Sequence, residues 1–176
     1  MRESLQIQAL LARIGEKMGM RIWLPRNDRQ GVLDLWQPEN ENTVISSLPF
    51  NYSDVAMRTI ENIDVLWVQG NTIRRAFEVE HTTSIYSGIL RMADLMALLP
   101  NLTITAHIVA PSNRRNKVLQ EIMRPVFSYL EGGPLSEKCT YLPYDAIIEL
   151  NSDERLHYMR DDVLQEFEES ANDSLL

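Results

Sequence analysis

The sequence contains a single cysteine, Cys139, among its 176 residues. A disulfide framework and a cysteine-rich zinc site are therefore excluded, and a lone thiol is typical of a reducing compartment. No apolar run approaches the roughly 18 residues that a membrane span needs. Charged residues interrupt residues 1–19, which favours an amphipathic helix over a signal peptide. These absences predict a cytoplasmic protein with no membrane partner.

Signatures of several enzyme classes are also missing. The sequence has no zinc-finger spacing, no glycine-rich phosphate loop and no GxSxG nucleophile elbow. Hydrophobic residues make up 44% of the chain and charged residues 24%, which is ordinary for a globular protein and excludes wholesale disorder. Folded domains mostly have about 100–200 residues, so the length predicts one domain.

The net charge of −8 does not exclude a nucleic-acid partner. Residues 151–176 hold eight acids and two arginines. The remaining 150 residues have 17 acids against 15 bases, so the body of the chain is nearly neutral. The negative charge is concentrated in a terminal segment, which is typical of a solvated face or a partner surface.

Hydrophobic spacing predicts an α/β fold. An apolar stripe at Ile7, Leu10, Leu11, Ile14 and Met18 predicts a first helix that ends at Gly19. Downstream we expect, in chain order, a strand over 20–24, a polar turn over 26–31, a strand over 32–36, a loop over 37–53, a helix over 53–61 capped by Ser53, a hairpin of strands 63–68 and 72–80, a helix over 84–99, a buried strand over 102–110, a helix over 113–130, strands over 139–142 and 146–150, and an acidic helix over 152–169. This order predicts a mixed sheet with helices on both faces.

Three carboxylates are expected to meet on the central hairpin. Asp64 begins one strand, whereas Glu78 and Glu80 end its partner on one shared face. The start of one hairpin strand lies beside the end of the other, so Asp64 should lie close to Glu78. Clustered carboxylates are costly without a cation, and oxygen ligands favour Mg²⁺ or Mn²⁺. The hairpin therefore predicts a metal site at Asp64, Glu78 and Glu80.

A solvated hairpin edge is the alternative interpretation of these acids. The flanking apolar residues Ile63, Val65, Phe77 and Val79, which should bury one face, favour a site within a packed element.

Asp64, thirteen intervening residues and then Glu78-Val79-Glu80, within this order of elements, resemble the PD-(D/E)xK nuclease superfamily. The resemblance covers roughly residues 5–110. It implies a restriction-endonuclease-like fold with an αβββαβ core over residues 1–150, followed by a C-terminal helical extension over residues 151–176. It also implies that Asp64 and Glu78 bind the metal ion.

The sequence departs from this family pattern at two positions. Glu80 stands where most members have the lysine that helps to activate the attacking water, so it acts either as a general base or as a second metal ligand. Gln8, eleven residues before Gly19, stands where many members contribute a glutamate from the first helix. A glutamine there orients a water or a phosphate without bringing charge to the metal.

Several further residues are candidate nucleic-acid contacts. They are His81 and Ser84 after the hairpin, Arg91 on the next helix, and the basic cluster Arg114, Arg115 and Lys117. Each has an alternative structural role: Ser84 as a helix cap, His81 as an incidental neighbour, Arg91 as an ion-pair partner of Asp94 or a hairpin acid, and the basic cluster as a solvated face.

The resemblance implies a Mg²⁺-dependent endonuclease that hydrolyses DNA, either a restriction or defence enzyme or the nuclease module of a larger protein. The alternative is a catalytically silent domain of the same fold that binds nucleic acid or protein. Because the sequence has no obvious recognition element, the nuclease is expected to obtain its sequence specificity from a partner subunit or a fused domain. A homodimer is also expected, docked through Leu156, Met159, Val163 and Phe167 of the last helix, unless that stripe packs on its own domain.

Overall fold

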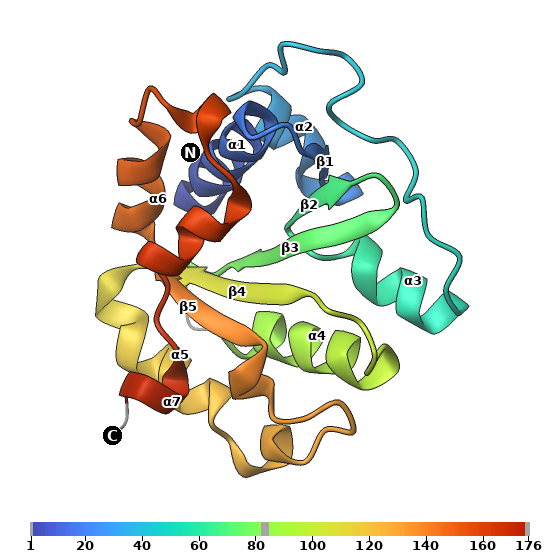
Figure 1. The fold of residues 1–176 in the computed structure, drawn as a ribbon, viewed down its shortest axis with the longest axis vertical. Helices are drawn as coiled ribbons and strands as arrows, with labels where there is room; N and C mark the ends of the chain where they lie inside the picture. The colour runs from blue at the N-terminus through green and yellow to red at the C-terminus, as the bar shows by residue number, and fades with distance from the viewer. Residues whose placement is uncertain (1, 82–84, 175–176) are drawn as a thin grey trace.

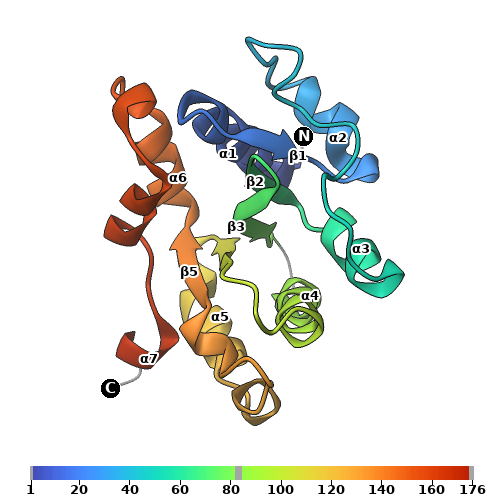
Figure 2. The same cartoon turned by 45° about the vertical axis from the view of Figure 1, so that its right-hand side comes forward.

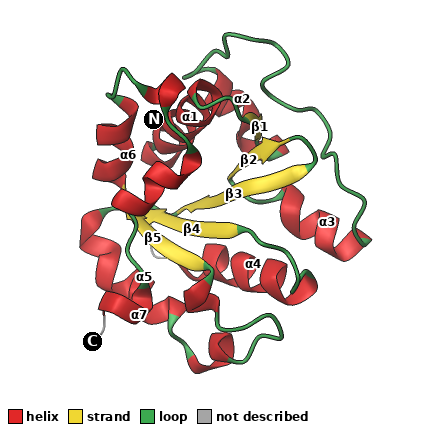
Figure 3. Ribbon diagram, in the orientation of Figure 1, coloured by secondary structure: helices red, strands yellow, loops and turns green. Residues whose placement is uncertain are grey.

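A five-stranded mixed sheet forms the centre of the computed structural model, which describes residues 2–81 and 85–174 (Figure 1, Figure 3). Its strands lie in chain order, and β1 to β3 are antiparallel whereas β3 to β5 are parallel. The strands are β1 (Arg21–Trp23), β2 (Val65–Gln69), β3 (Thr72–Val79), β4 (Thr105–Ala110) and β5 (Cys139–Pro143). The predicted α/β class with a mixed sheet is confirmed.

Helices cover both faces of this sheet, with α1 and α6 on one side and α4 and α5 on the other (Figure 2). The helices are α1 (Glu3–Lys17), α2 (Arg26–Leu33), α3 (Asp54–Glu61), α4 (Ile85–Leu98), α5 (Arg115–Ile122), α6 (Tyr144–Asn151) and the short α7 (Ala171–Ser174). No helix in the described ranges is long and apolar enough to cross a membrane.

The alternation of strand side chains divides the core into two clusters. In the hairpin, Val65, Trp67, Phe77 and Val79 pack beneath α1 and α6. Even-numbered hairpin residues such as Leu66 and Ala76 pack beneath α3 and α4 instead. Because Glu78 and Glu80 continue the even-numbered series of β3, their side chains face α4. Ile63 was expected with Val65 but lies in the opposite cluster, because it precedes the first paired residue of β2 by two positions and is outside the strand alternation.

The central elements follow the expected order. Gly70 turns the β2–β3 hairpin with a φ of 59°, a left-handed conformation that glycine adopts without steric cost. Ser53 caps α3, since its hydroxyl accepts a hydrogen bond from the backbone nitrogen of Ala56. Helix α4 then crosses from β3 to the parallel strand β4, as a parallel connection requires.

Five predictions outside the centre are wrong. The polar turn over 26–31 and the strand over 32–36 are together helix α2, and the strand over 146–150 is helix α6. The helix over 113–130 is shorter, because α5 ends at Ile122. The acidic helix over 152–169 is absent, and the chain there forms the 3₁₀ turns η4 (Leu156–Tyr158) and η5 (Asp161–Glu166).

The C-terminal segment packs onto the sheet through a buried ion pair. Asp161 accepts a hydrogen bond of 2.7 Å from Arg75 of β3, and both side chains are almost fully buried. Arg74 contacts the same carboxylate at 3.1 Å. Leu156 of the expected docking stripe is buried in the core, and Met159, Val163 and Phe167 pack against it. The stripe therefore packs on its own domain, which is the alternative to a dimer interface.

Removing one partner of this pair should destabilise the protein strongly. We expect Asp161→Ala to lower the free energy of unfolding by about 3–5 kcal/mol, because it leaves the buried Arg75 uncompensated. Asp162→Ala, at the exposed neighbouring position, should change it by less than about 0.5 kcal/mol. Urea unfolding of both variants checks the difference, and equal effects would contradict an anchoring role for the pair.

Candidate active site

Three carboxylates converge where the β2–β3 hairpin meets α4. Asp64 directly precedes β2, Glu78 lies in β3, and Glu80 follows the last residue of that strand. The antiparallel pairing of Val65 with Phe77 sets Asp64 beside Glu78. The structure thus brings together the three acids that the sequence predicted to meet.

Asp64 is held in place by the backbone of the opposite strand. Its Oδ2 accepts a hydrogen bond of 2.7 Å from the backbone nitrogen of Val79. Burial raises the pKa of Asp64 to about 6, although this hydrogen bond and the charge of Arg91 act in the opposite direction. The carboxyl is therefore oriented by the sheet but costly to keep ionised.

Glu78 is the most deeply buried of the three acids, with 2% of its surface exposed. Burial, followed by repulsion from Asp64, raises its pKa well above the ordinary value. Both of its carboxylate oxygens contact Nη1 of Arg91, at 2.6 and 2.7 Å. Arg91 is also the basic group whose charge lowers the pKa of all three carboxyls. Of the two roles that the sequence left open for Arg91, the structure has the ion pair with a hairpin acid.

Glu80 depends on a close approach of α4. Its Oε1 accepts a hydrogen bond of 3.0 Å from the backbone nitrogen of Gly88, in the first turn of that helix. A Cβ atom on Gly88 would lie 2.2 Å from the same oxygen and 3.0 Å from Cβ of Glu78. Burial, followed by repulsion from Asp64, raises the pKa of Glu80 to about 7. Gly88 is thus a site residue that the sequence analysis missed.

Helix α1 brings Gln8 to the other side of the hairpin. The helix packs closely on β2, because Gly15 lies against Trp67, whose Nε1 donates a 3.0 Å hydrogen bond to the carbonyl of Leu11. Gln8 is buried, and its Nε2 donates to Oδ2 of Asp28 at 3.1 Å. Its Oε1 is buried and has no hydrogen-bond partner among residues 2–81 and 85–174, which leaves an acceptor available for a ligand.

Asp28 is a second residue that the sequence analysis missed. It lies on α2, in the segment that was predicted to be a turn. Repulsion from its charge helps to raise the pKa of Asp64, so it belongs to the electrostatic surroundings of the cluster. The sequence carries no signal for it, because its contact with Gln8 joins two helices that are 20 residues apart.

The donor set fits a hard divalent cation in its chemistry. Asp64, Glu78 and Glu80 supply oxygen ligands in a buried cluster with raised pKa values, and the Oε1 atom of Gln8 is an additional buried acceptor. Among the described residues, however, no three acidic, histidine or cysteine side chains are already arranged around a single metal position. A cation that used Glu78 would have to replace Arg91 on at least one of its oxygens.

Three of the other predicted nucleic-acid contacts lie beside acids outside the carboxylate cluster. His81 is exposed and its Nδ1 lies 3.0 Å from Oε2 of Glu3 on α1. Arg115 pairs with Glu169 of the C-terminal segment, and Lys117 pairs with Glu121 of its own helix. Arg114 lies in the turn before α5, and Ser84 lies outside the described residues.

Comparisons with known proteins agree with a nuclease relationship. A family model described as the C-terminal domain of the type II restriction enzyme NmeDI matches residues 1–171. The type II restriction enzyme NmeDI of Neisseria meningitidis serogroup C is 37% identical over 163 residues, which cover 86% of this chain and 43% of that enzyme. The chain therefore spans less than half the length of this relative. No solved structure matches.

Filling the space at Gly88 should disrupt the packing of α4 on the carboxylates. We expect Gly88→Ala to lower the free energy of unfolding by about 1–3 kcal/mol, the usual cost of overpacking. Gly31→Ala in α2 is the matched control, because its Cβ meets only the mobile end of the Leu5 side chain. That change should stay within about 1 kcal/mol, the helix-propensity difference between the two residues. Denaturant unfolding distinguishes the variants, and equal effects would contradict a need for glycine at position 88.

Neutralising Asp64 should stabilise the metal-free protein at neutral pH. A carboxyl whose pKa is raised from 3.8 to about 6 on folding binds its proton more tightly in the folded state, so its contribution destabilises the protein as pH rises through this interval. We expect Asp64→Asn to raise the free energy of unfolding by up to about 3 kcal/mol at pH 7.5. The gain should vanish near pH 4, and denaturant unfolding in EDTA at both pH values measures it.

Asp162→Asn, which removes an exposed carboxylate of the same type, is the control and should change stability by less than about 0.5 kcal/mol at either pH. A pH-independent effect of Asp64→Asn, or a loss of stability at pH 7.5, would contradict the strained carboxylate cluster.

Proposed function

The chain belongs to the family of the C-terminal domain of the type II restriction enzyme NmeDI, and on this premise we propose that it is a metal-dependent endonuclease domain of the PD-(D/E)xK type. Its substrate is DNA, and its cofactor is Mg²⁺ or Mn²⁺. The observation that carries the proposal is the buried cluster of Asp64, Glu78 and Glu80. A domain with a purely structural role has no use for three mutually repelling buried acids.

Asp64 and Glu78 are the residues that hold the cation, with Glu80 beside them. A bound divalent ion supplies charge neutralisation at the phosphodiester and lowers the pKa of a bound water. The hydrogen bond from the backbone of Val79 fixes the orientation of Asp64, so its second oxygen is presented in a defined direction. The positive charge of the cation would favour the ionised form of Asp64 and Glu78. It would thereby offset the effect of burial, which raises the pKa values of both carboxyls.

Glu80 is the general base in this proposal. Its pKa of about 7 lies near neutral pH, where about half of the carboxyls are ionised and the carboxylate accepts a proton effectively. The hydrogen bond from Gly88 holds one of its oxygens and leaves the other for the attacking water. At this position most members of the superfamily have a positively charged lysine. Here a carboxylate stands in its place and acts as a base.

Arg91 and Gln8 are the proposed orienting groups. Arg91 brings a guanidinium against Glu78, and a guanidinium also pairs well with a phosphate that approaches the same oxygens. The free Oε1 acceptor of Gln8 suits a water at the cluster, and its Nε2 is fixed by Asp28. Arg91 thus orients a phosphate and Gln8 orients a water, and neither residue adds negative charge to the cluster.

The family supports a partner for sequence recognition. Because the chain spans 43% of its relative, a further domain of a longer protein is the proposed source of recognition, with a second copy as the route to cutting both strands. The apolar stripe at residues 156–167 does not support such a dimer, because its side chains pack against the core of their own domain.

A catalytically silent domain is the second candidate function. The ion pair between Arg91 and both oxygens of Glu78 favours it, because a cation already supplied by the protein satisfies the acid without a metal. Such a domain would bind DNA or protein and leave cleavage to another part of a larger enzyme.

Cleavage assays separate the two candidates. With Mg²⁺ or Mn²⁺ the wild type should cut DNA, and EDTA should abolish cutting. We expect Asp64→Asn and Glu78→Gln each to reduce the rate by at least about 10²–10³, since each removes a charged metal ligand. Glu154→Gln, an exposed control, should retain the wild-type rate. Wild-type protein that binds DNA but does not cut with any divalent metal would contradict the nuclease and favour the silent domain.

A further inference from the structure

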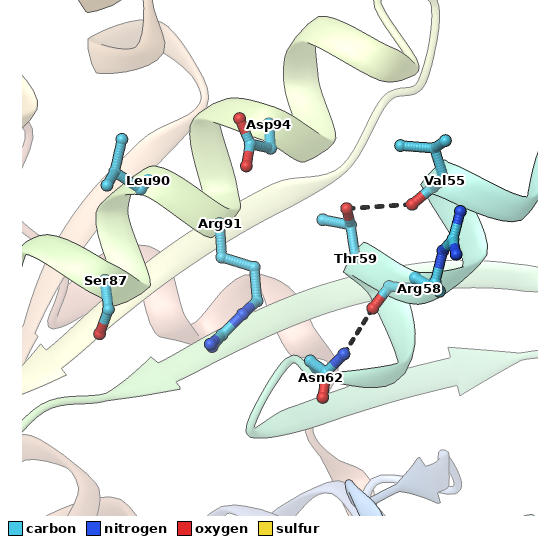
Figure 4. A pocket seen from close by; sticks show the side chains of 8 residues that line it. All are labelled: Val55, Arg58, Thr59, Asn62, Ser87, Leu90, Arg91 and Asp94. Carbon is cyan, nitrogen blue, oxygen red and sulfur yellow. Dashed lines mark hydrogen bonds between the residues drawn. The ribbon is translucent and has the colours of Figure 1, made fainter.

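A groove lined by both apolar and polar side chains lies between α3 and α4 (Figure 4). It has a volume of about 440 Å³, and its walls include Arg58 and Thr59 from α3 and Ser87 and Arg91 from α4. Arg91 contributes to both features, because the same side chain contacts Glu78. The groove and the carboxylates therefore share a wall.

A second hollow continues the groove toward the start of α2. It has a volume of about 240 Å³ and is lined in part by Arg26 and Asn27. Asn62, at the end of α3, lines both hollows. Asn62 also lies two residues before Asp64, so the two hollows meet where the chain enters the carboxylate cluster. We refer to the two hollows, which adjoin at Asn62, as one path.

The cations along this path suit an anionic polymer. Arg58 and Arg26 lie on different helices, and Arg91, which lines the same hollow as Arg58, also contacts Glu78. The acids Asp94 and Glu61 line the path as well, so three arginines stand against two acids. Within the described part of the chain, no hydrogen bond or ion pair engages the guanidinium of Arg58 or of Arg26. By contrast, the basic residues near α5 that the sequence suggested, Arg115 and Lys117, are paired with acids. Unpaired arginines along a groove can neutralise phosphates without displacing an internal partner.

We propose that the groove between α3 and α4 binds the phosphodiester backbone of one nucleic-acid strand and leads it to the carboxylates, with Arg58 as a phosphate contact remote from the chemistry. This inference rests on the proposed function, since it assigns the substrate-binding surface of that same site. It also gives Arg91 two partners on one side of α4: Glu78 within the cluster and a phosphate in the groove. A phosphate that draws the Arg91 guanidinium toward the groove would release Glu78 from its ion pair. Strand binding and the freeing of Glu78 are then coupled through Arg91.

The test is DNA binding in EDTA, where cleavage does not occur. Fluorescence anisotropy of a labelled duplex and a labelled single strand should give about tenfold weaker binding for Arg58→Glu than for wild type. Arg58→Lys should retain most of the affinity, because lysine also neutralises a phosphate. Arg58→Ala should lower the slope of log affinity against log salt by about one, as expected for the loss of one phosphate contact.

Arg160→Glu is the matched control, because it makes the same charge reversal at an exposed position whose neighbours Met159 and Val163 pack on the other face of the sheet. It should weaken binding much less than Arg58→Glu. Equal losses for the two reversals, or no binding by wild type, would overturn the groove assignment. Weaker binding by Arg58→Glu with a wild type that never cleaves would keep the groove and reject the nuclease. Normal cleavage and binding by Arg58→Glu would reject the groove and keep the nuclease.

Discussion

The burial of three carboxylates between β3 and α4 is the constraint on which the rest of the site depends. Glu78 and Glu80 point toward α4, and Asp64 reaches them from the neighbouring strand. This arrangement is tolerable only because Arg91 supplies a compensating charge and because Gly88 lets the helix backbone donate a hydrogen bond. The raised pKa values of the acids show that keeping them ionised still costs free energy of folding. A cation would remove that cost, which links the stability of the domain to its chemistry.

The two faces of the sheet differ in what they carry: one is covered by packed helices and the C-terminal segment, and the other holds the carboxylate cluster. The face under α1 and α6 is apolar and is sealed by the C-terminal segment, which the buried pair of Arg75 and Asp161 anchors. The face under α4 carries the acids and opens into the groove between α3 and α4. The negative net charge is therefore compatible with a DNA partner, since eight of the acids lie in residues 151–176 and the apolar residues at 156–167 of that segment pack on the face away from the groove.

The hairpin and its acids could be predicted from the sequence because local patterns specify them. Alternation of apolar residues, the Gly70-Asn71 turn and the spacing of Asp64 from Glu78 fix the register. Helix α2 was missed because its sequence, RNDRQGVL, buries only Val32 and shows no apolar stripe. Helix α6 was missed because a short apolar run does not distinguish a strand from a helix. The roles of Gly88, Asp28 and Arg58 depend on contacts between elements distant in sequence, for which one sequence carries no signal.

The central claim is that Asp64 and Glu78 form a cation site that Arg91 partly occupies. Anomalous diffraction from crystals soaked in Mn²⁺ tests it most directly. The account predicts a manganese peak within about 2–2.5 Å of an oxygen of each carboxylate, with the Arg91 guanidinium moved away from at least one Glu78 oxygen. Crystals that bind manganese only elsewhere, with Arg91 still on both oxygens of Glu78, would contradict it.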